Sequence, residues 1–224
     1  YKKLDLNKTK LYCINMEAIK KIEINKIVKI ILIAIAGTLL LTISAKIKIP
    51  FYPVPMTMQT FVVLFLGITL GPKIGLLTLS LYLFEGIFGL PVFAGTPEKG
   101  IGLTYFMGPT GGYLVGFLAA TYVAGSFKYE SCFDKFKFNP HLPFALRIVD
   151  GITSSIKISF TNLIKLIFAV SFIYIFGLLW LGSLIGWDKP IFQFGAQPFL
   201  LAELFKMLIL SIIAGSLYKI KKFI

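Results

Sequence analysis

Long apolar runs, separated by shorter polar or turn-rich segments, dominate the hydrophobic pattern of this chain. Runs of this kind, nearly free of charged residues, are typical of helices that cross a lipid bilayer. We predict six such spans, at approximately residues 27–47, 57–70, 74–90, 113–127, 161–185 and 199–218. The expected fold is therefore an all-α membrane protein in which residues 24–224 form a single domain of six transmembrane helices.

A polar and basic segment, residues 1–23, precedes the first span. The chain opens on Tyr1, and its first methionine is Met16. We interpret residues 1–23 as an N-terminal extension, and we assign no structure to residues 1–15, which need not be native. The first apolar run is long and lacks a clear small-residue cleavage site, so we expect no cleavable signal peptide.

Three loops between the predicted spans are rich in proline or glycine and are also apolar; they cover residues 49–59, 89–110 and 187–198. The first loop has three prolines within six residues, a density that excludes a regular helix because proline lacks a backbone N–H. Irregular backbone at membrane depth is stable only where it is buried in protein or lines a cavity. We therefore expect these loops to cap a ligand cavity.

The basic residues are distributed unevenly between the two sides of the predicted bundle. Six spans place both termini on the same side of the membrane. If that side is the inner one, the inner segments hold 17 of the 23 basic residues and the outer segments hold 4. Cytoplasmic segments carry such an excess of lysine and arginine. We therefore expect cytoplasmic termini, a location in the bacterial cytoplasmic membrane, and a cavity that faces outward.

Composition and absent motifs exclude several other functions. Hydrophobic residues make up 57% of the 224 residues, and the mean hydropathy is +0.84, which is far from a soluble domain. The net charge of +13 comes mainly from lysines between the apolar runs, so it reflects membrane topology rather than nucleic-acid binding. The chain has no G-x-x-x-x-G-K-[ST], H-E-x-x-H or G-x-S-x-G motif. We expect no catalytic residues, no bound metal and no cofactor.

An acid and a base lie inside the last predicted span. Glu203 and Lys206 are three residues apart, so they share one face of a helix. On insertion scales, one charge near the middle of a membrane helix costs roughly 2.5–3.5 kcal/mol. Two interpretations follow: a structural ion pair in which the charges neutralise each other, or a pair that faces a cavity and binds a ligand.

One face of the first predicted span carries small side chains. Ala34, Thr38 and Thr42 recur every four residues along it. Small residues let membrane helices approach closely. This face either packs inside the protein or forms a docking site for a partner protein.

Several of these segments, taken together, resemble the BioY family, the biotin-binding substrate-specificity (S) components of energy-coupling factor (ECF) transporters. The motifs that carry the resemblance are, in order, Ile49-Pro50, Pro53-Val54-Pro55-Met56-Thr57-Met58-Gln59-Thr60, Gly71-Pro72, Gly89-Leu90-Pro91-Val92-Phe93-Ala94-Gly95 and Gly108-Pro109-Thr110-Gly111-Gly112-Tyr113-Leu114-Val115-Gly116-Phe117. The resemblance implies a six-helix membrane protein that binds biotin from outside. It also implies a membrane-embedded coupling protein (T component) and two cytoplasmic ATPases as partners.

The resemblance further implies where biotin binds. In the family, an acid and a lysine three residues apart in the last helix contact biotin, and these positions are Glu203 and Lys206 here. The family more often has aspartate at the first position, and glutamate is one methylene longer. Aromatic residues near these polar groups would wall the apolar bicycle of biotin. The remaining expected ligand-binding residues are Tyr52, Thr57, Gln59, Phe93, Gly112 and Tyr113.

Three alternatives to biotin capture stay open from the sequence, and one of them is a structural membrane subunit in which the Glu203–Lys206 pair has no ligand. The chain could be an S component for another vitamin, such as thiamine or riboflavin. It could also be an intramembrane enzyme that modifies a lipid, with Glu203 and Lys206 as acid and base. Binding of biotin without turnover would separate capture from catalysis.

Overall fold

The structure, a computed structural model, describes residues 2–49, 56–98, 100–133 and 144–221. Its elements are almost all helical, and the two strands pair antiparallel over two residues each. In chain order the elements are α1 (Lys2–Lys46), β1 (Lys48–Ile49), β2 (Met56–Thr57), α2 (Gln59–Ile87), α3 (Leu103–Phe106), α4 (Gly111–Ser126), α5 (Phe144–Ile185), α6 (Ile191–Gly195) and α7 (Gln197–Ile220).

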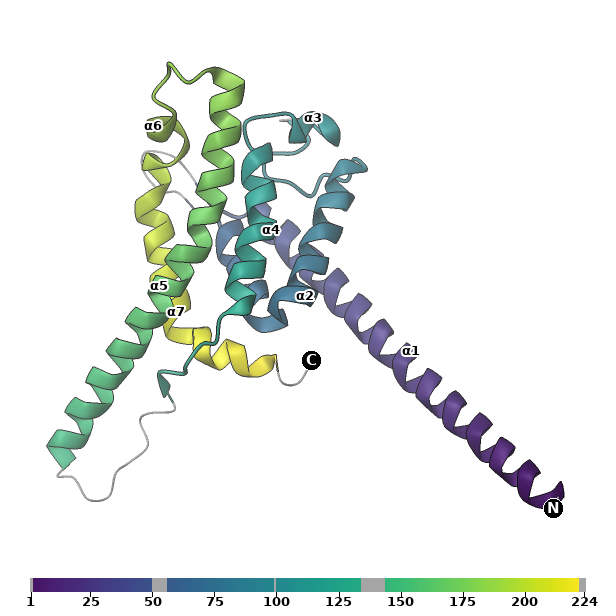
Figure 1. The fold of residues 1–224 in the computed structure, drawn as a ribbon. Coiled ribbons are helices and arrows are strands. Elements are labelled where there is room, and N and C mark those ends of the chain that lie inside the picture. Colours follow the sequence, from purple (N-terminus) through teal and green to yellow (C-terminus); the bar gives the residue numbers. More distant parts are fainter. Residues whose placement is uncertain (1, 50–55, 99, 134–143, 222–224) are drawn as a thin grey trace.

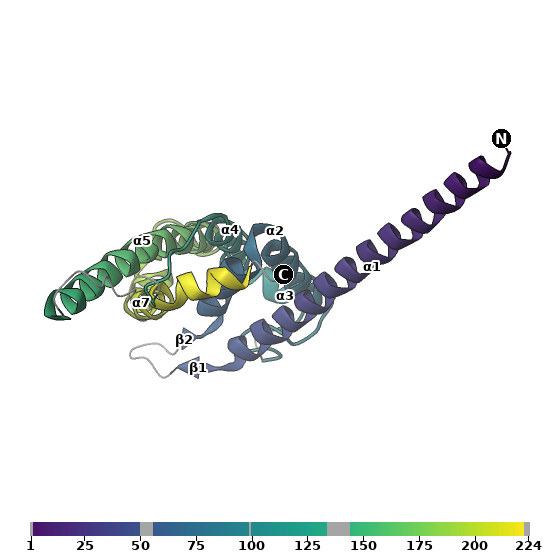
Figure 2. The ribbon, with the colours of Figure 1, turned by 90° about the horizontal axis from the view of Figure 1, so that it is seen from below.

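The long helices form a bundle in which α4 lies between α2 and α5 (Figure 1). Helix α7 packs against α2 and α5, and α1 packs against α2. The short helices α3 and α6 lie at one end of the bundle. The N-terminal end of α1 and the C-terminal end of α7 lie toward the other (Figure 1). Viewed from below, α1 leaves the bundle on the side away from α5 (Figure 2).

Helix α2 folds back on itself at Gly71, so it contains two antiparallel arms, residues 59–70 and 72–87. Gly71 has φ 77° and ψ 179°, a conformation open to glycine and strained for other residues, and Pro72 follows it. The amide Nε2 of Gln59 donates to the hydroxyl of Tyr82 at 2.7 Å, although 23 residues in one straight helix would separate them by about 35 Å. The hairpin places the predicted spans 57–70 and 74–90 side by side.

Four helices in the described part of the chain are long and apolar enough to cross a membrane: Ile24–Lys46 within α1, α2, Val149–Ile185 within α5, and α7. This finding bears out the prediction of an all-α protein with several membrane helices. Helix α4 is also apolar but has 16 residues. Its length of about 24 Å is still most of the hydrocarbon thickness of a bilayer.

Two segments are more helical than the sequence suggested. Helix α5 begins at Phe144, well before residue 161, where we predicted the fifth span to begin. Helix α1 begins at Lys2, in a region to which we assigned no structure. Polar residues in both stretches hid this continuity, because helices that extend beyond a membrane no longer need an apolar surface.

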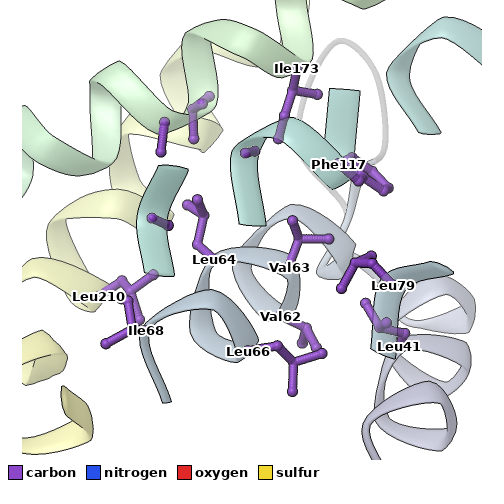
Figure 3. Close-up of a cluster of buried hydrophobic side chains, with 14 of the residues drawn as sticks. Leu41, Val62, Val63, Leu64, Leu66, Ile68, Leu79, Phe117, Ile173 and Leu210 are labelled. Carbon is purple, nitrogen blue, oxygen red and sulfur yellow. The ribbon is translucent and has the colours of Figure 1, made fainter. Parts of the chain in front are cut away.

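The core lies where α1, both arms of α2, α4, α5 and α7 meet (Figure 3). Close approach of these helices depends on small residues. A Cβ on Gly116 of α4 would lie 2.7 Å from the Cα of Ile173 in α5, so only glycine fits there. Core side chains that represent the contributing elements are Leu41, Val63, Leu79, Phe117, Ile173 and Leu210.

The small face of α1 packs inside the bundle. Ala34 and Thr38 are each 2% exposed, and Gly37 lies against Thr78 in the second arm of α2. Thr42 is partly buried and donates to the carbonyl of Thr38. This placement favours the internal-packing interpretation of the face over the docking interpretation.

We predict that Gly116→Ala destabilises the bundle. The added methyl group meets the backbone of α5, and overpacking of this kind typically costs about 1–3 kcal/mol. Thermal unfolding of the detergent-purified protein measures the effect, and Val115→Ala on the exposed side of α4 is the matched control. An unfolding temperature for Gly116→Ala equal to that of the control would contradict the close α4–α5 contact.

Candidate functional site

A cavity of about 470 Å³ lies toward the end of the bundle that carries α3 and α6. The residues that line it come from segments far apart in the sequence: β2, the start of α2, α3, α4, α5, α6 and the start of α7. The volume falls in the range of small-ligand sites, roughly 300–1,000 Å³. The walls are mostly apolar and aromatic, with residues Leu114, Phe117, Ile173, Leu181, Ile185, Phe194 and Phe199 among them.

Glu203 lines this cavity and forms a buried ion pair with Lys206. The Nζ of Lys206 lies 3.0 Å from the Oε1 of Glu203, and the two side chains are 4% and 3% exposed. Both residues lie on the buried face of α7, about two turns from its start, where Pro198 occupies the first turn. Either charge alone would be costly at this depth, so each residue stays charged and buried only because the other lies beside it.

Lys206 is bound entirely by groups of the protein. Besides Glu203, its ammonium donates to the carbonyl of Thr57 at 2.7 Å and to the Oγ1 of Thr60 at 3.1 Å. An ammonium has three donors, so these three acceptors satisfy it. Lys206 is not among the residues that line the cavity.

Glu203 has one carboxylate oxygen in use and one available. Its Oε1 accepts from Thr60 Oγ1 at 2.7 Å and from Lys206. Among the described residues, no group donates to Oε2, and this atom is not one of the fully buried polar atoms without a partner. Glu203 lines the cavity, so its carboxylate, with Oε2 unused by the described residues, is available there as a hydrogen-bond acceptor.

Gln59 adds a second acceptor to the same end of the cavity. Its Nε2 donates to Tyr82, whose own hydroxyl donates to the carbonyl of Val92. These bonds fix the amide with its oxygen free to accept. Thr57, which we predicted along with Gln59, also lines the cavity. Glu203, Gln59 and Thr57 therefore give the site a polar end beside its apolar walls.

Two tyrosine hydroxyls connect the helices to the loops that cover the cavity. Tyr113 on α4 donates to the carbonyl of Gly195 at 2.8 Å, which ties α4 to α6. Tyr105 on α3 donates to the carbonyl of Ala94 at 2.9 Å. Burial raises the pKa of Tyr105, so its hydroxyl keeps the proton that it donates. Both tyrosines line the cavity as well.

Lys46, at the end of α1, holds the loop that follows α2. Its ammonium donates to the carbonyls of Phe93 and Thr96, at 3.1 and 2.9 Å, and to the hydroxyl of Thr96 at 2.9 Å. Lys46, at the end of the first predicted span, thus fixes one of the covering loops to α1.

Some of the predicted ligand-binding residues lie elsewhere. Phe93 is 1% exposed and packs among Tyr82, Tyr105 and Phe106 behind the cavity wall. Gly112 faces Trp180 of α5, where a Cβ would overlap the tryptophan side chain. Tyr52 lies outside the described residues.

Several residues that line the cavity or contact its polar end were not predicted from the sequence. Thr60 is the most consequential, because it contacts both members of the ion pair. Tyr174 on α5 also lines the cavity, and its hydroxyl in the middle of an apolar run was the available signal. Tyr105, Phe194 and Phe199 carried no signal of their own, because aromatic residues are common throughout this chain.

Comparison with known proteins assigns the chain to a family. The model of the BioY family matches residues 15–223. A probable biotin transporter BioY from Pyrococcus horikoshii is 32% identical over 178 residues, which cover 80% of this chain and 89% of that protein. A probable biotin transporter BioY from Rickettsia prowazekii is 28% identical over 196 residues, which cover 88% of this chain and 84% of that protein.

A solved structure has the same fold. It is the crystal structure of the S-component for biotin from an ECF-type ABC transporter, with a TM-score of 0.59 and 27% sequence identity. The similarity covers 87% of this chain and 93% of the other. The resemblance that the sequence motifs indicated is therefore confirmed.

We predict that Lys206→Met destabilises the protein by about 3–5 kcal/mol, because it leaves the buried carboxylate of Glu203 without its cation. The double variant Glu203→Met/Lys206→Met should recover most of this loss, since it removes both charges at similar volume. Thermal unfolding in detergent, without ligand, measures both variants. A double variant as unstable as the single one would show that the pair is not a coupled unit.

Proposed function

Because this chain belongs to the BioY family, we propose that it is the membrane-embedded, biotin-binding substrate-capture subunit of an ECF-type vitamin uptake transporter. The observation that carries this proposal is the cavity with Glu203 at its polar end and apolar walls around it. Relatives named as biotin transporters, and an S-component for biotin of the same fold, support biotin as the ligand.

The chemistry of biotin fits the two kinds of surface in the cavity. Its ureido ring carries two N–H donors, and Glu203 Oε2 and Gln59 offer acceptors on one side of the site. A hydrogen bond to a charged acceptor is among the stronger ones in proteins. The apolar thioether ring and the alkyl chain suit walls such as Phe117, Ile173 and Phe199.

The family is a transporter family, so this chain is a carrier and not an enzyme. Glu203 contacts the ligand, Lys206 holds Glu203 in place, and neither residue transforms the ligand. The sequence has no phosphate-binding loop for ATP, so the energy for inward release comes from partners. We propose a membrane-embedded T component and two cytoplasmic ATPases in this role, with biotin and the lipid bilayer as the other molecules that the chain contacts.

The proposed topology has six membrane spans: α1, the two arms of α2, α4, α5 and α7. Both termini lie in the cytoplasm, because the excess of basic residues falls on their side. The cavity then opens toward the outside, near α3 and α6, and Lys73 at the hairpin of α2 lies on the cytoplasmic side.

This topology predicts opposite labelling of two exposed positions. In a background that lacks Cys13 and Cys132, Lys189→Cys should react with a membrane-impermeant maleimide on intact cells. Lys73→Cys should react only after the membrane is permeabilised. Equal labelling of both sites on intact cells, or the reverse pattern, would contradict the proposed orientation.

We predict that Glu203→Ala and Lys206→Ala each weaken biotin binding at least tenfold, or about 1.4 kcal/mol. The first removes the acceptor in the cavity, and the second removes the cation that holds it in place. Isothermal titration of the detergent-purified protein with biotin measures the loss. Glu98→Ala and Lys189→Ala, both exposed, are the matched controls.

The same titration, extended to thiamine and riboflavin, tests the alternatives. Tight binding of another vitamin in place of biotin would assign a different S component. Recovery of chemically altered biotin or lipid, by mass spectrometry, would favour an enzyme. Unchanged affinity in a folded Lys206→Ala variant would remove the assigned site.

A further inference from the structure

We propose that Thr60 is a positioning residue for ligand binding: its hydroxyl fixes the carboxylate of Glu203 so that one oxygen faces the ligand. The inference rests on the proposed function, because the ligand used to test it is biotin. It goes beyond that function by assigning a role to a residue outside the acid–lysine pair. Thr60 is the second residue of α2, and it lies across the site from α7.

The hydrogen bonds of Thr60 differ in kind from those of Thr42, Thr69 and Thr78, three other threonines in the described helices. Thr42, Thr69 and Thr78 each donate to the backbone carbonyl four residues earlier in the same helix. That bond is the usual one for a threonine in an apolar helix. Thr60 instead donates to Glu203 Oε1 at 2.7 Å and accepts from Lys206 at 3.1 Å.

A hydroxyl suits this position because it can donate and accept at once. The donor and acceptor of Thr60 are both used on the ion pair, so α2 and α7 are connected by side chains at the polar end of the cavity. Thr57 completes the connection through its carbonyl, which accepts from the same ammonium at 2.7 Å. β2 and the start of α2 thereby supply one each of the three acceptors around Lys206.

The consequence falls on Glu203. A glutamate side chain has several rotamers, and a carboxylate held by a single bond could rotate either oxygen away from the cavity. Two donors on Oε1, one from α2 and one from α7, leave Oε2 as the oxygen that faces the ligand. Lys206, whose three donors are occupied inside the protein, acts here as a positioning residue and Glu203 as the contact.

The test compares Thr60→Val, which keeps the shape but removes the hydroxyl, with Thr60→Ser, which keeps the hydroxyl. We expect Thr60→Val to weaken biotin binding about tenfold by isothermal titration, and Thr60→Ser to restore most of the affinity. Thr78→Val, which removes a buried hydroxyl far from Glu203, is the matched control and should leave the affinity within twofold.

A double-mutant cycle separates positioning from a general loss of stability. In a Glu203→Met background, Thr60→Val should weaken biotin binding by no more than twofold, because Thr60 acts through Glu203. Thr60→Val should also reduce the affinity for biotin methylated on its ureido nitrogens by a smaller factor than it reduces the affinity for biotin. Full additivity in the cycle, or wild-type affinity in Thr60→Val, would overturn the proposal.

The same cycle, measured by thermal unfolding without ligand, keeps the two proposals distinguishable. If the wild-type protein fails to bind biotin, the proposed function fails. Coupling between Thr60→Val and Glu203→Met in unfolding would still support the link from Thr60 to the carboxylate, and its absence would overturn that link whatever the ligand is.

Discussion

The rest of the structure depends on a buried ion pair between a lysine and a glutamate of α7, which packs against the start of α2. At membrane depth each charge alone would be costly, and the pair removes that cost only if its remaining hydrogen-bonding groups are satisfied. Lys206 finds two further acceptors, Thr57 in β2 and Thr60 at the start of α2. The segment that enters α2 must therefore lie against α7, although about 140 residues separate them in the chain. This requirement places β2 and the start of α2 beside the cavity.

The remaining architecture brings several helices close enough to enclose that pair. Helices in lipid gain little from the hydrophobic effect when they associate, so close van der Waals packing has to stabilise their contacts. Gly71 lets α2 turn back, and Gly116 lets α4 lie against the backbone of α5. The result is that α2, α4, α5 and α7 surround one cavity, while Tyr113 and Lys46 fasten the covering segments to the helices beneath them.

Features imposed by the bilayer could be predicted from the sequence, and features set by packing could not. Apolar runs marked the membrane helices, and a charge pair inside one of them marked the polar end of the cavity. Which neighbour a side chain meets depends on helix rotation and on contacts from distant segments. Phe93 belongs to a family-like motif but packs into the core, and Thr60 was passed over because its partners lie on α7. The length of α5 was missed for a different reason, since polar helix and polar loop look alike in composition.

An ion pair that is held in place by the protein's own groups has a consequence for capture and for release. Ligand binding does not have to strip water from a free ammonium or reorder Lys206, because that side chain is already held by protein groups. Such preorganisation lowers the cost of binding and so favours tight capture at low ligand concentration. The same preorganisation makes release difficult, because the carboxylate of Glu203 stays fixed as long as α2 and α7 stay together. Separating α2 from α7 would break the contacts of Thr57 and Thr60 with the pair and free Glu203 to rotate. A partner that drives this separation could empty the site without touching the ligand.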